Sequence, residues 1–456
     1  MIEQMIYRKI SILTVVKRIS LGVAFLNFTT VGAQHIYTLQ SCLEEGLQNN
    51  YSLRIVRNSE QMAHNNATLG NAGYLPTLDL TASYNGTVDD TDTKNRTTGE
   101  ISSEDNVFDQ TYNAGLSLNW TIFDGFGIQT NYKRLKELER QGETNTRIAI
   151  EDFIAELSAE YYNFVQQKIR LKNLRYAVSL SKERLRIVEA RYNIGSFSRL
   201  DLQQARVDFN ADSAGYMKQQ EIVHSSRIRL NELMAVRDMN GPVIVRDTLI
   251  IPNTLLQFER LWSNTLRTNA SLLKAEHEQR LARFDLNAVR SRNYPYLKVN
   301  AGYGYTHNKY DMGVNSYRDN WGLKFGVTTG VNLFNGNRRR ENRNARLAME
   351  NARLKREELE QSLKADLMNL WQAYCNNIEL LNLERNNLTA ARDNYEIARE
   401  RYLLGDLSGI EMREAQKSLL DAEERILSAE YSTKMCEISL LQISGCITET
   451  FLSAEF

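Results

Sequence analysis

The chain contains an internal duplication over most of its length, and this feature constrains its fold more than any other. With an offset of 219 positions, the matched residues are Asn50/Asn269, Ser52/Ser271, Leu53/Leu272, Pro76/Pro295, Leu78/Leu297 and Tyr84/Tyr303. The offset then becomes 211 or 210, at Phe123/Phe334, Gly125/Gly336, Arg191/Arg401, Tyr192/Tyr402, Gly195/Gly405 and Ser198/Ser408. A large unit has therefore been duplicated, and its length varies mainly in one loop between Tyr84 and Phe123.

Each copy begins with a helical pattern and continues with two segments of period two. The first helix is expected over about 41–71, with Ser41 and Glu44 as a capping box, and its counterpart from near Thr254 to about 292. Apolar and polar residues then alternate in two pairs of segments, about 77–123 and about 296–334, and within each pair the strands are joined by a loop, over about 86–109 and about 307–319. Such alternation predicts two β-hairpins, each with one apolar and one polar face.

A half-buried soluble sheet is one interpretation of this alternation, and a membrane barrel is the other. The segments are longer than typical soluble strands, and aromatic residues such as Tyr84, Trp120 and Trp321 lie toward their ends, which favours the membrane. Four strands cannot close a barrel, and open edges are costly in lipid. Other chains must supply the missing strands: three chains would give twelve strands, although closure alone also allows a tetramer.

Long helical patterns follow each hairpin. Proline-free stretches run over about 129–192 and 337–402, and returning helices are expected over about 198–234 and 408–443. At ~1.5 Å per residue, the longer helices would approach ~95 Å, which is typical of coiled-coil packing rather than of a compact domain. Each pair turns at a Tyr-x-x-Gly sequence. Residues 240–252 predict a turn and a short strand between the copies.

The first 33 residues resemble a secretory signal, with basic residues, a short apolar run over 21–28 and a small-residue site ending at Ala33. An N-terminal membrane anchor is the alternative, but the run is shorter than the ~20 residues that span a bilayer. The expected organisation is a signal over 1–33, repeat 1 over 34–239, a linker or small equatorial segment over 240–256, repeat 2 over 257–445 and a tail over 446–456.

The order of these pieces resembles the outer-membrane efflux protein family, the TolC-like channel-tunnels. The sequences that carry the resemblance are Asn-Tyr-Ser-Leu at 50–53, Asn-Ala-Ser-Leu at 269–272, Tyr-Leu-Pro at 74–76, Ile-Phe-Asp-Gly at 122–125, Leu-Phe-Asn-Gly at 333–336, and the turns at 191–198 and 401–408. The resemblance implies a homotrimer with a 12-stranded outer-membrane barrel and a periplasmic helical barrel in a Gram-negative bacterium. It also implies docking to a periplasmic adaptor (membrane fusion) protein and an inner-membrane pump, for efflux or type I secretion.

The resemblance also assigns roles to residues at the two turns. It implies adaptor contacts at the tips, at Gly195, Ser196, Ser198, Gly405, Asp406 and Ser408. It implies a periplasmic gate at Asp201, Tyr402, Glu411 and Glu414, where a trimer would form rings of carboxylates that favour cations. Exposed helix charges are the alternative for these acids. One position departs from the family pattern, because Leu407 stands where a basic gating residue is often found.

Composition argues against other classes of protein. With 56 basic and 56 acidic residues the net charge is zero, which does not suit a nucleic-acid binder. The five histidines and four cysteines lack metal-ligand or C-x-x-C spacing, and no nucleophile or phosphate-loop motif is present, so we expect neither an enzyme nor a cofactor. A structural coiled-coil envelope protein without transport activity remains the alternative function. Arg338, Arg339 and Arg340 are either a solvated helix start or a contact for lipid phosphate.

Overall fold

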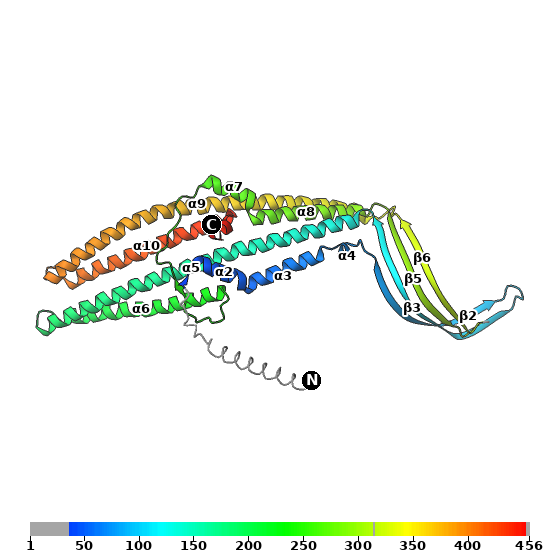
Figure 1. Cartoon of the computed structure of the whole chain (residues 1–456), viewed down its shortest axis with the longest axis horizontal. Coiled ribbons are helices and arrows are strands. Elements are labelled where there is room, and N and C mark those ends of the chain that lie inside the picture. Colours follow the sequence, from blue (N-terminus) through cyan, green and yellow to red (C-terminus); the bar gives the residue numbers. More distant parts are fainter. Residues whose placement is uncertain (1–35, 313–314, 453–456) are drawn as a thin grey trace, which may run out of the picture.

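The computed structural model of the chain describes residues 36–312 and 315–452. The molecule is long and narrow, with its strands at one end and the tips of two helical hairpins at the other (Figure 1). The signal predicted over residues 1–33 lies outside the described residues. Within those ranges, no helix combines the length and the apolar character needed to cross a membrane.

Four long antiparallel strands form one sheet in the order β2-β3-β5-β6. Their bounds are β2 Thr77–Lys94, β3 Ile101–Asp124, β5 Tyr296–Lys309 and β6 Tyr317–Gly330. Residues that pair directly share a face, so Leu80, Leu116, Tyr303 and Leu323 form one row across the sheet. All four side chains are exposed. The sheet therefore presents an apolar face to its surroundings, as the alternation predicts.

The first hairpin is longer than the prediction. We expected a polar loop over about 86–109, but β2 and β3 remain paired as far as Lys94 and Ile101, and only residues 95–100 form the turn. Beyond Tyr84 both faces of β2 are mainly polar, so the period-two hydrophobic signal stops although the backbone pairing continues. A register shift between Asp89 and Thr91 interrupts the ladder there. In Figure 1 the end of this hairpin projects well beyond the second one.

The second hairpin is also tighter than expected. Its predicted loop over about 307–319 shortens to residues 310–316, which include the undescribed 313–314. Its last strand ends at Gly330 instead of continuing to 334, because residues 331–335 leave the ladder before the following helix begins.

The first helical segment of copy one is three helices rather than one. Their bounds are α2 Leu39–Asn49, α3 Tyr51–Asn66 and α4 Leu69–Ala72. The chain breaks at Asn50, whose side-chain oxygen accepts hydrogen bonds from the backbone N–H groups of Ser52 and Leu53. The capping box of α2 consists of Thr38 and Ser41, so the predicted box of Ser41 with Glu44 is wrong by three positions.

Copy two repeats this arrangement with α7 Phe258–Thr268 and α8 Ala270–Ser291. The predicted start near Thr254 is four residues early. Asn269 caps α8 through the N–H of Leu272, and its Nδ2 donates to the carbonyl of Ile443 at 2.9 Å. Asn50 likewise donates to the carbonyl of Leu233 at 3.1 Å. The duplicated Asn residues therefore have the same role in both copies. Each caps the start of one helix and donates a hydrogen bond to the last turn of a returning helix.

Two long helical hairpins complete the molecule. They consist of α5 Gly127–Asn193 with α6 Arg199–Leu233, and α9 Asn337–Leu404 with α10 Gly409–Ile443. Toward the strands, the helices pack in the order α3-α5-α8-α9; toward the tips, the order is α6-α5-α10-α9. Helix α5 is therefore central in both layers, whereas α9 is an edge in both (Figure 1).

A core at mid-height joins the two layers. It is built around fully buried side chains of α2, α5, α6 and the loop after α6, including Leu43, Ile154, Tyr161, Leu230 and Met234. The short strand predicted between the copies is β4 Ile244–Val245, which pairs in parallel with β1 Ile36–Tyr37. The tail begins with a short helix, α11 Ile447–Leu452.

Candidate functional site

Both helical hairpins turn at a glycine with left-handed backbone. Gly195 and Gly405 follow α5 and α9 with φ angles of 76° and 91°. Their N–H groups donate to the carbonyls of Tyr192 at 2.9 Å and Tyr402 at 3.2 Å, which closes the last turn of each helix. An added Cβ would meet nothing within 4 Å at either position. The six predicted tip residues are all exposed on these two turns.

Two of the predicted gate acids cap the returning helices. Asp201 accepts from the backbone N–H of Ser198 at 3.0 Å, and Glu411 accepts from that of Ser408 at 2.9 Å. In return, each serine hydroxyl accepts from the N–H of its acid, which completes a capping box. Hydrogen bonds from the serines lower the pKa of Asp201 and of Glu411 below their ordinary values. Both acids are exposed and remain charged at neutral pH.

The sequence carried a signal for these caps that the prediction missed. Ser408-Gly-Ile-Glu411 has the Ser-x-x-Glu spacing of a capping box, and Ser198-Arg-Leu-Asp201 is its counterpart. Glu414 lies one turn after Glu411 and is exposed, and it forms no ion pair within the described residues. Among the predicted gate acids, Glu414 is therefore the one whose carboxylate is not held by a neighbouring group in the described part of the chain.

Tyr402 is the predicted gate residue that lies inside the protein. It is 3% exposed and packs with Met412, Ala415 and Leu419 of the returning helix. Its hydroxyl has no hydrogen-bond partner in the described part of the chain, and burial raises its pKa. The ring of Tyr402 lies beneath the guanidinium of Arg191, 5.7 Å away, which comes from the other hairpin.

A cavity of about 460 Å³ lies between the two tips. Of the predicted residues, it brings together Asp201, Tyr402, Gly405, Asp406 and Ser408. Gly195, Ser196, Ser198, Glu411 and Glu414 lie outside its wall. Arg184 contributes a buried guanidinium whose Nε has no partner among the described groups, although its Nη2 is paired with Asp208.

The prediction missed the polar contacts that tie one hairpin to the other. Arg413 of α10 forms a bidentate ion pair with Asp212 of α6, at 2.8 and 2.7 Å. Arg170 of α5 also forms an ion pair with Glu424 of α10. These partners are more than 200 positions apart, so no local sequence pattern identifies them.

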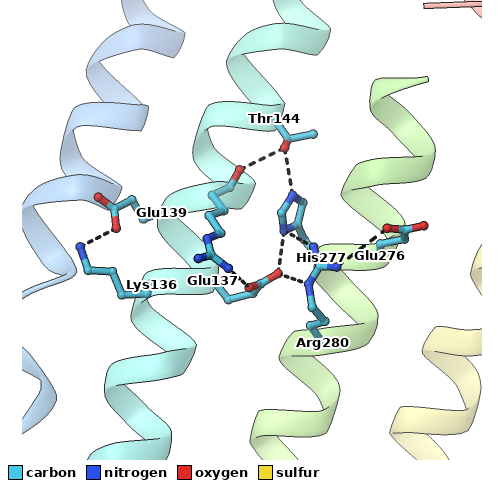
Figure 2. Close-up of polar contacts among 8 residues, drawn as sticks. Lys136, Glu137, Glu139, Thr144, Glu276, His277 and Arg280 are labelled. Atoms are coloured by element: carbon cyan, nitrogen blue, oxygen red, sulfur yellow. Dashed lines mark hydrogen bonds and ion pairs between the residues drawn. The ribbon is translucent and has the colours of Figure 1, made fainter. Parts of the chain in front are cut away.

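A second cluster lies between α5 and α8, nearer the strands (Figure 2). Glu137 is 3% exposed and accepts from His277 at 2.7 Å and from Arg280. The second ring nitrogen of His277 is 3.1 Å from the hydroxyl of Thr144. Burial raises the pKa of Glu137, but the hydrogen bonds from Arg280 and His277 outweigh it, so the pKa lies below its ordinary value. This cluster holds α5 against α8 with a desolvated charge rather than with apolar packing alone.

A protein-family model matches most of the chain. The model described as outer membrane efflux protein matches residues 42–236 and 261–446, which are the two copies of the duplicated unit. The chain belongs to this family. It is therefore an outer membrane efflux protein, the outer-membrane duct of an efflux system, and the alternative of a structural envelope protein without transport is not supported. The family is one of ducts rather than of enzymes.

Curated relatives match this efflux protein along nearly all of its length. The outer membrane protein TolC of Vibrio cholerae is 21% identical over 417 residues, which cover 90% of this chain and 91% of TolC. The solvent efflux pump outer membrane protein SrpC of Pseudomonas putida is 23% identical over 428 residues, covering 88% of this chain and 84% of SrpC. The similarity to these relatives therefore extends over both copies of the duplicated unit.

Solved structures show the same fold. The Campylobacter jejuni CmeC outer membrane channel superposes with a TM-score of 0.73 at 18% identity, covering 90% of this chain and 85% of CmeC. The open state of the Neisseria gonorrhoeae MtrE channel gives a TM-score of 0.70 at 16% identity, covering 89% of this chain and 88% of MtrE. The predicted channel-tunnel fold of the efflux protein is thus confirmed.

Proposed function

We propose that three copies of this efflux protein close into one duct, with a barrel in the outer membrane of a Gram-negative cell and helices in the periplasm. The observation that carries the proposal is that the sheet and the helical layers have their unpaired edges on the same two sides of the molecule. Strand β2 and helix α3 form one edge, and β6 and α9 form the other. A single rotation can therefore join β2 to a neighbouring β6, and α3 to a neighbouring α9.

The open edges of the sheet support this closure. Within the described residues β2 and β6 each pair on one side only. Leu78 and Leu80 of β2 are exposed, and so are Leu323 and Phe325 of β6. Unpaired backbone in lipid costs several kcal/mol for each group, whereas three sheets of four strands close without an edge.

The open edges of the helices support it as well. Helices α3 and α4 expose apolar residues at intervals of four and seven, at Tyr51, Ile55, Met62 and Leu69. Helix α9 exposes Leu347, Leu354 and Met368 at multiples of seven. Nearer the tips, α6 exposes Leu200 and Val207, and α9 exposes Ile397 and Leu404, again at intervals of seven. Stripes with this spacing are typical of coiled-coil seams between neighbouring helices.

The tips and the returning helices then serve the periplasmic end. We assign the exposed turns at Gly195 and Gly405 to contacts with a periplasmic adaptor, which connects the duct to an inner-membrane pump. We assign the gate to the region of Asp201, Tyr402, Glu411 and Glu414, where α6 and α10 begin. Relatives from Pseudomonas putida are named as outer membrane proteins of solvent and toluene efflux pumps, which supports a role in efflux.

Assembly tests this proposal directly. The detergent-solubilised protein should have the mass of three chains by light scattering, and should conduct ions in planar bilayers. Replacing Ile55 and Met62 with Glu should prevent assembly, because a neighbouring α9 would then bury unpaired charges. The same change at the exposed Lys172 and Arg175 of α5 is the control. A monomer with full conductance, or a trimer that survives the α3 changes, would contradict the closure.

Adaptor contact has a separate test. Tryptophan at Ser196 and Asp406 enlarges the exposed turns without touching the hairpin cores, so we expect loss of crosslinking to the periplasmic adaptor. Tryptophan at the exposed Ser179 of α5 is the control. Unchanged crosslinking with the tip variant would remove the tips from the adaptor interface.

A further inference from the structure

An arginine cluster occupies the start of α9, just after the last strand. Five arginines fall within nine positions, at Arg338, Arg339, Arg340, Arg343 and Arg346. Four of them, with Asn293 and Asn342, line a cavity of about 490 Å³. Four are exposed and Arg338 is half-buried. The sequence alone left two explanations for this cluster, a solvated helix start or a phosphate contact.

The charge of this arginine cluster is not balanced by acids in the described part of the chain. No carboxylate of the described residues forms an ion pair with any of the five. Arg338 donates to the carbonyl of Asn332 at 2.7 Å. The Nε of Arg343 donates to the carbonyl of Arg339 at 3.4 Å. The nearby Glu341 pairs with Arg292 instead, at 3.3 Å.

The position of the arginines at a helix N-terminus makes their unbalanced positive charge unfavourable. The N-terminus of a helix carries a partial positive charge, so cations there are unfavourable and anions are favoured. At the start of helix α9 the neutral side chain of Asn335 accepts from the N–H of Asn337 at 3.0 Å, and the first turn contains no acidic residue. A helix start of this kind lacks a negative charge, and an external anion would supply it.

The first copy shows that the strand–helix junction does not need arginines. With the offset of 211, their counterparts at the start of α5 are Gly127, Ile128, Gln129, Tyr132 and Leu135. Ile128 and Leu135 are buried, and the carboxylate of Asp124 accepts from the N–H of Ile128 at 2.9 Å. The first copy thus has an acid at the start of its helix, whereas the second copy has the neutral Asn335 at the equivalent position and gathers basic residues around it.

The surroundings indicate where the anion comes from. Between the strand and the arginines, Leu333 and Phe334 are 91% and 89% exposed. Exposed apolar side chains beside arginines are typical of the boundary between acyl chains and headgroups. In the proposed trimer the neighbouring edge would consist of the end of α3, α4 and the start of β2, and residues 61–78 contain no Asp or Glu. Residues 61–78 of a neighbouring chain therefore offer the cluster no carboxylate, and the acids that flank this stretch are Glu60 and Asp79.

We propose that the arginine cluster binds the phosphate groups of anionic phospholipids in the leaflet next to the helices, while Leu333 and Phe334 contact their acyl chains. The inference rests on the proposed membrane orientation of the trimer. Guanidinium groups suit this task because they bind phosphate through two parallel N–H donors. The trimer would carry three such sites, all from the second copy of the unit.

The test compares lipids on the purified trimer. We would measure its apparent Tm in detergent with added phosphatidylglycerol, with phosphatidylcholine and with inorganic phosphate alone. Phosphatidylglycerol should raise the Tm of the wild type by several degrees more than phosphatidylcholine, and 0.5 M NaCl should remove most of this difference. The R339Q/R340Q/R343Q variant should lose the difference. The K172Q/R175Q/K182Q variant, which removes three exposed charges from α5 near the other end, should keep it.

Each other outcome counts against the lipid site. An equal response to both lipids in the wild type, or an undiminished difference in R339Q/R340Q/R343Q, overturns the proposal. A similar rise with inorganic phosphate alone assigns the cluster to free phosphate and overturns the lipid assignment. If the triple variant does not assemble, the salt dependence of the wild type and the single R339Q variant decide the matter. Light scattering on the same samples reports the trimer separately, so failure of the lipid site is distinct from failure of the trimer.

Discussion

Helices α5 and α9 hold matched places in the duplicated unit and have nearly equal lengths, 67 and 68 residues. Their surroundings nevertheless differ: 18 residues of α5 are buried but only 7 of α9. Helix α5 packs between neighbours on both sides, and α9 lies at the edge of both layers. The duplication therefore produced one central and one peripheral helix from equivalent sequences. The residues that differ between the copies show how a central helix and an edge helix differ in packing.

The two strand–helix junctions show the difference at single residues. Gly125 and Gly336 are equivalent in sequence, but Gly125 has a φ of 71° and lies against the backbone of Ser291. Gly336 has a φ of −55° and an added Cβ there would meet nothing within 4 Å. The same motif is thus a tightly packed joint in the centre of the unit and an open one at its edge.

The largest effect should come from alanine at these two glycines. At Gly125 the new Cβ would lie 2.2 Å from the carbonyl oxygen of Ser291, on a backbone that alanine adopts poorly. We expect a loss of roughly 3 kcal/mol or more, seen as a lower yield of folded protein. Alanine at Gly336 should change stability by only about 0.5 kcal/mol. Equal yields of folded protein for G125A and G336A, measured by size-exclusion chromatography, would contradict the difference between the junctions.

The next effect tests the buried charge of α5. The counterpart of Glu137 in α9 is Ala348, so the cluster with His277 and Arg280 belongs to the central helix alone. Glu137→Gln removes the charge that both partners need, and we expect a loss of about 2 kcal/mol, less than for a fully buried pair because Arg280 is half-exposed. Glu350→Gln, which touches only an exposed ion pair on α9, is the control and should leave the Tm unchanged.

The same variant has a pH signature. The folded-state pKa of Glu137 lies below its ordinary value of 4.5, so its carboxylate stabilises the fold fully above that pH. The contribution is lost as the pH falls from about 4.5 through the lower folded-state pKa. The gap in Tm between the wild type and E137Q should therefore narrow in acid and stay constant from pH 6 to 8. A gap that does not change in acid would show that Glu137 acts only through its shape.

The sequence was informative where a pattern is local or repeated. Period-two alternation located the apolar part of the sheet, and the repeated Tyr-x-x-Gly located both tips, because turns and strand faces depend on neighbours in the chain. It failed where polar residues continue a strand, as in β2 beyond Tyr84, since hydrophobicity then no longer reports the pairing. It also could not distinguish a central copy from an edge copy, because that depends on what packs outside each unit.

The candidate site shows the same limit. The tip residues were placed correctly on exposed turns, whereas Tyr402 proved to be buried, because a tyrosine at helical spacing can face either the core or a neighbour. The partners Asp212 and Arg413 belong to different copies, and only the packing of α6 beside α10 brings them together. Local spacing would have revealed the capping boxes at Ser198 and Ser408 but no contact across the hairpins.

A smaller effect should follow from breaking that cross-hairpin pair. Asp212→Asn leaves the guanidinium of Arg413 without its carboxylate and should weaken the contact between the hairpins by about 1.5 kcal/mol. If the hairpins separate when the duct opens, the conductance of D212N in planar bilayers should exceed that of the wild type. The double variant with exchanged charges, R413D/D212R, should restore the lower conductance. R399Q, which loses an ion pair within α9 alone, should match the wild type.

The smallest effect concerns the acids after the second tip, where the copies differ again. Asp201 and Gln204 of copy one correspond to Glu411 and Glu414 of copy two, so the second tip carries the additional carboxylate. Because glutamine also completes a capping box with Ser408, E411Q removes the charge without uncapping α10, whereas E411A removes both. If these acids line the gate, E411Q/E414Q should lower cation selectivity in bilayers with no change in Tm, and E414Q alone should account for most of it, since its charge has no local partner in the described part of the chain. Unchanged selectivity in the double variant would leave Glu411 as a cap and Glu414 as an exposed helix charge, and the gate would have to be sought on the cavity side of the tips, around Tyr402 and Asp406.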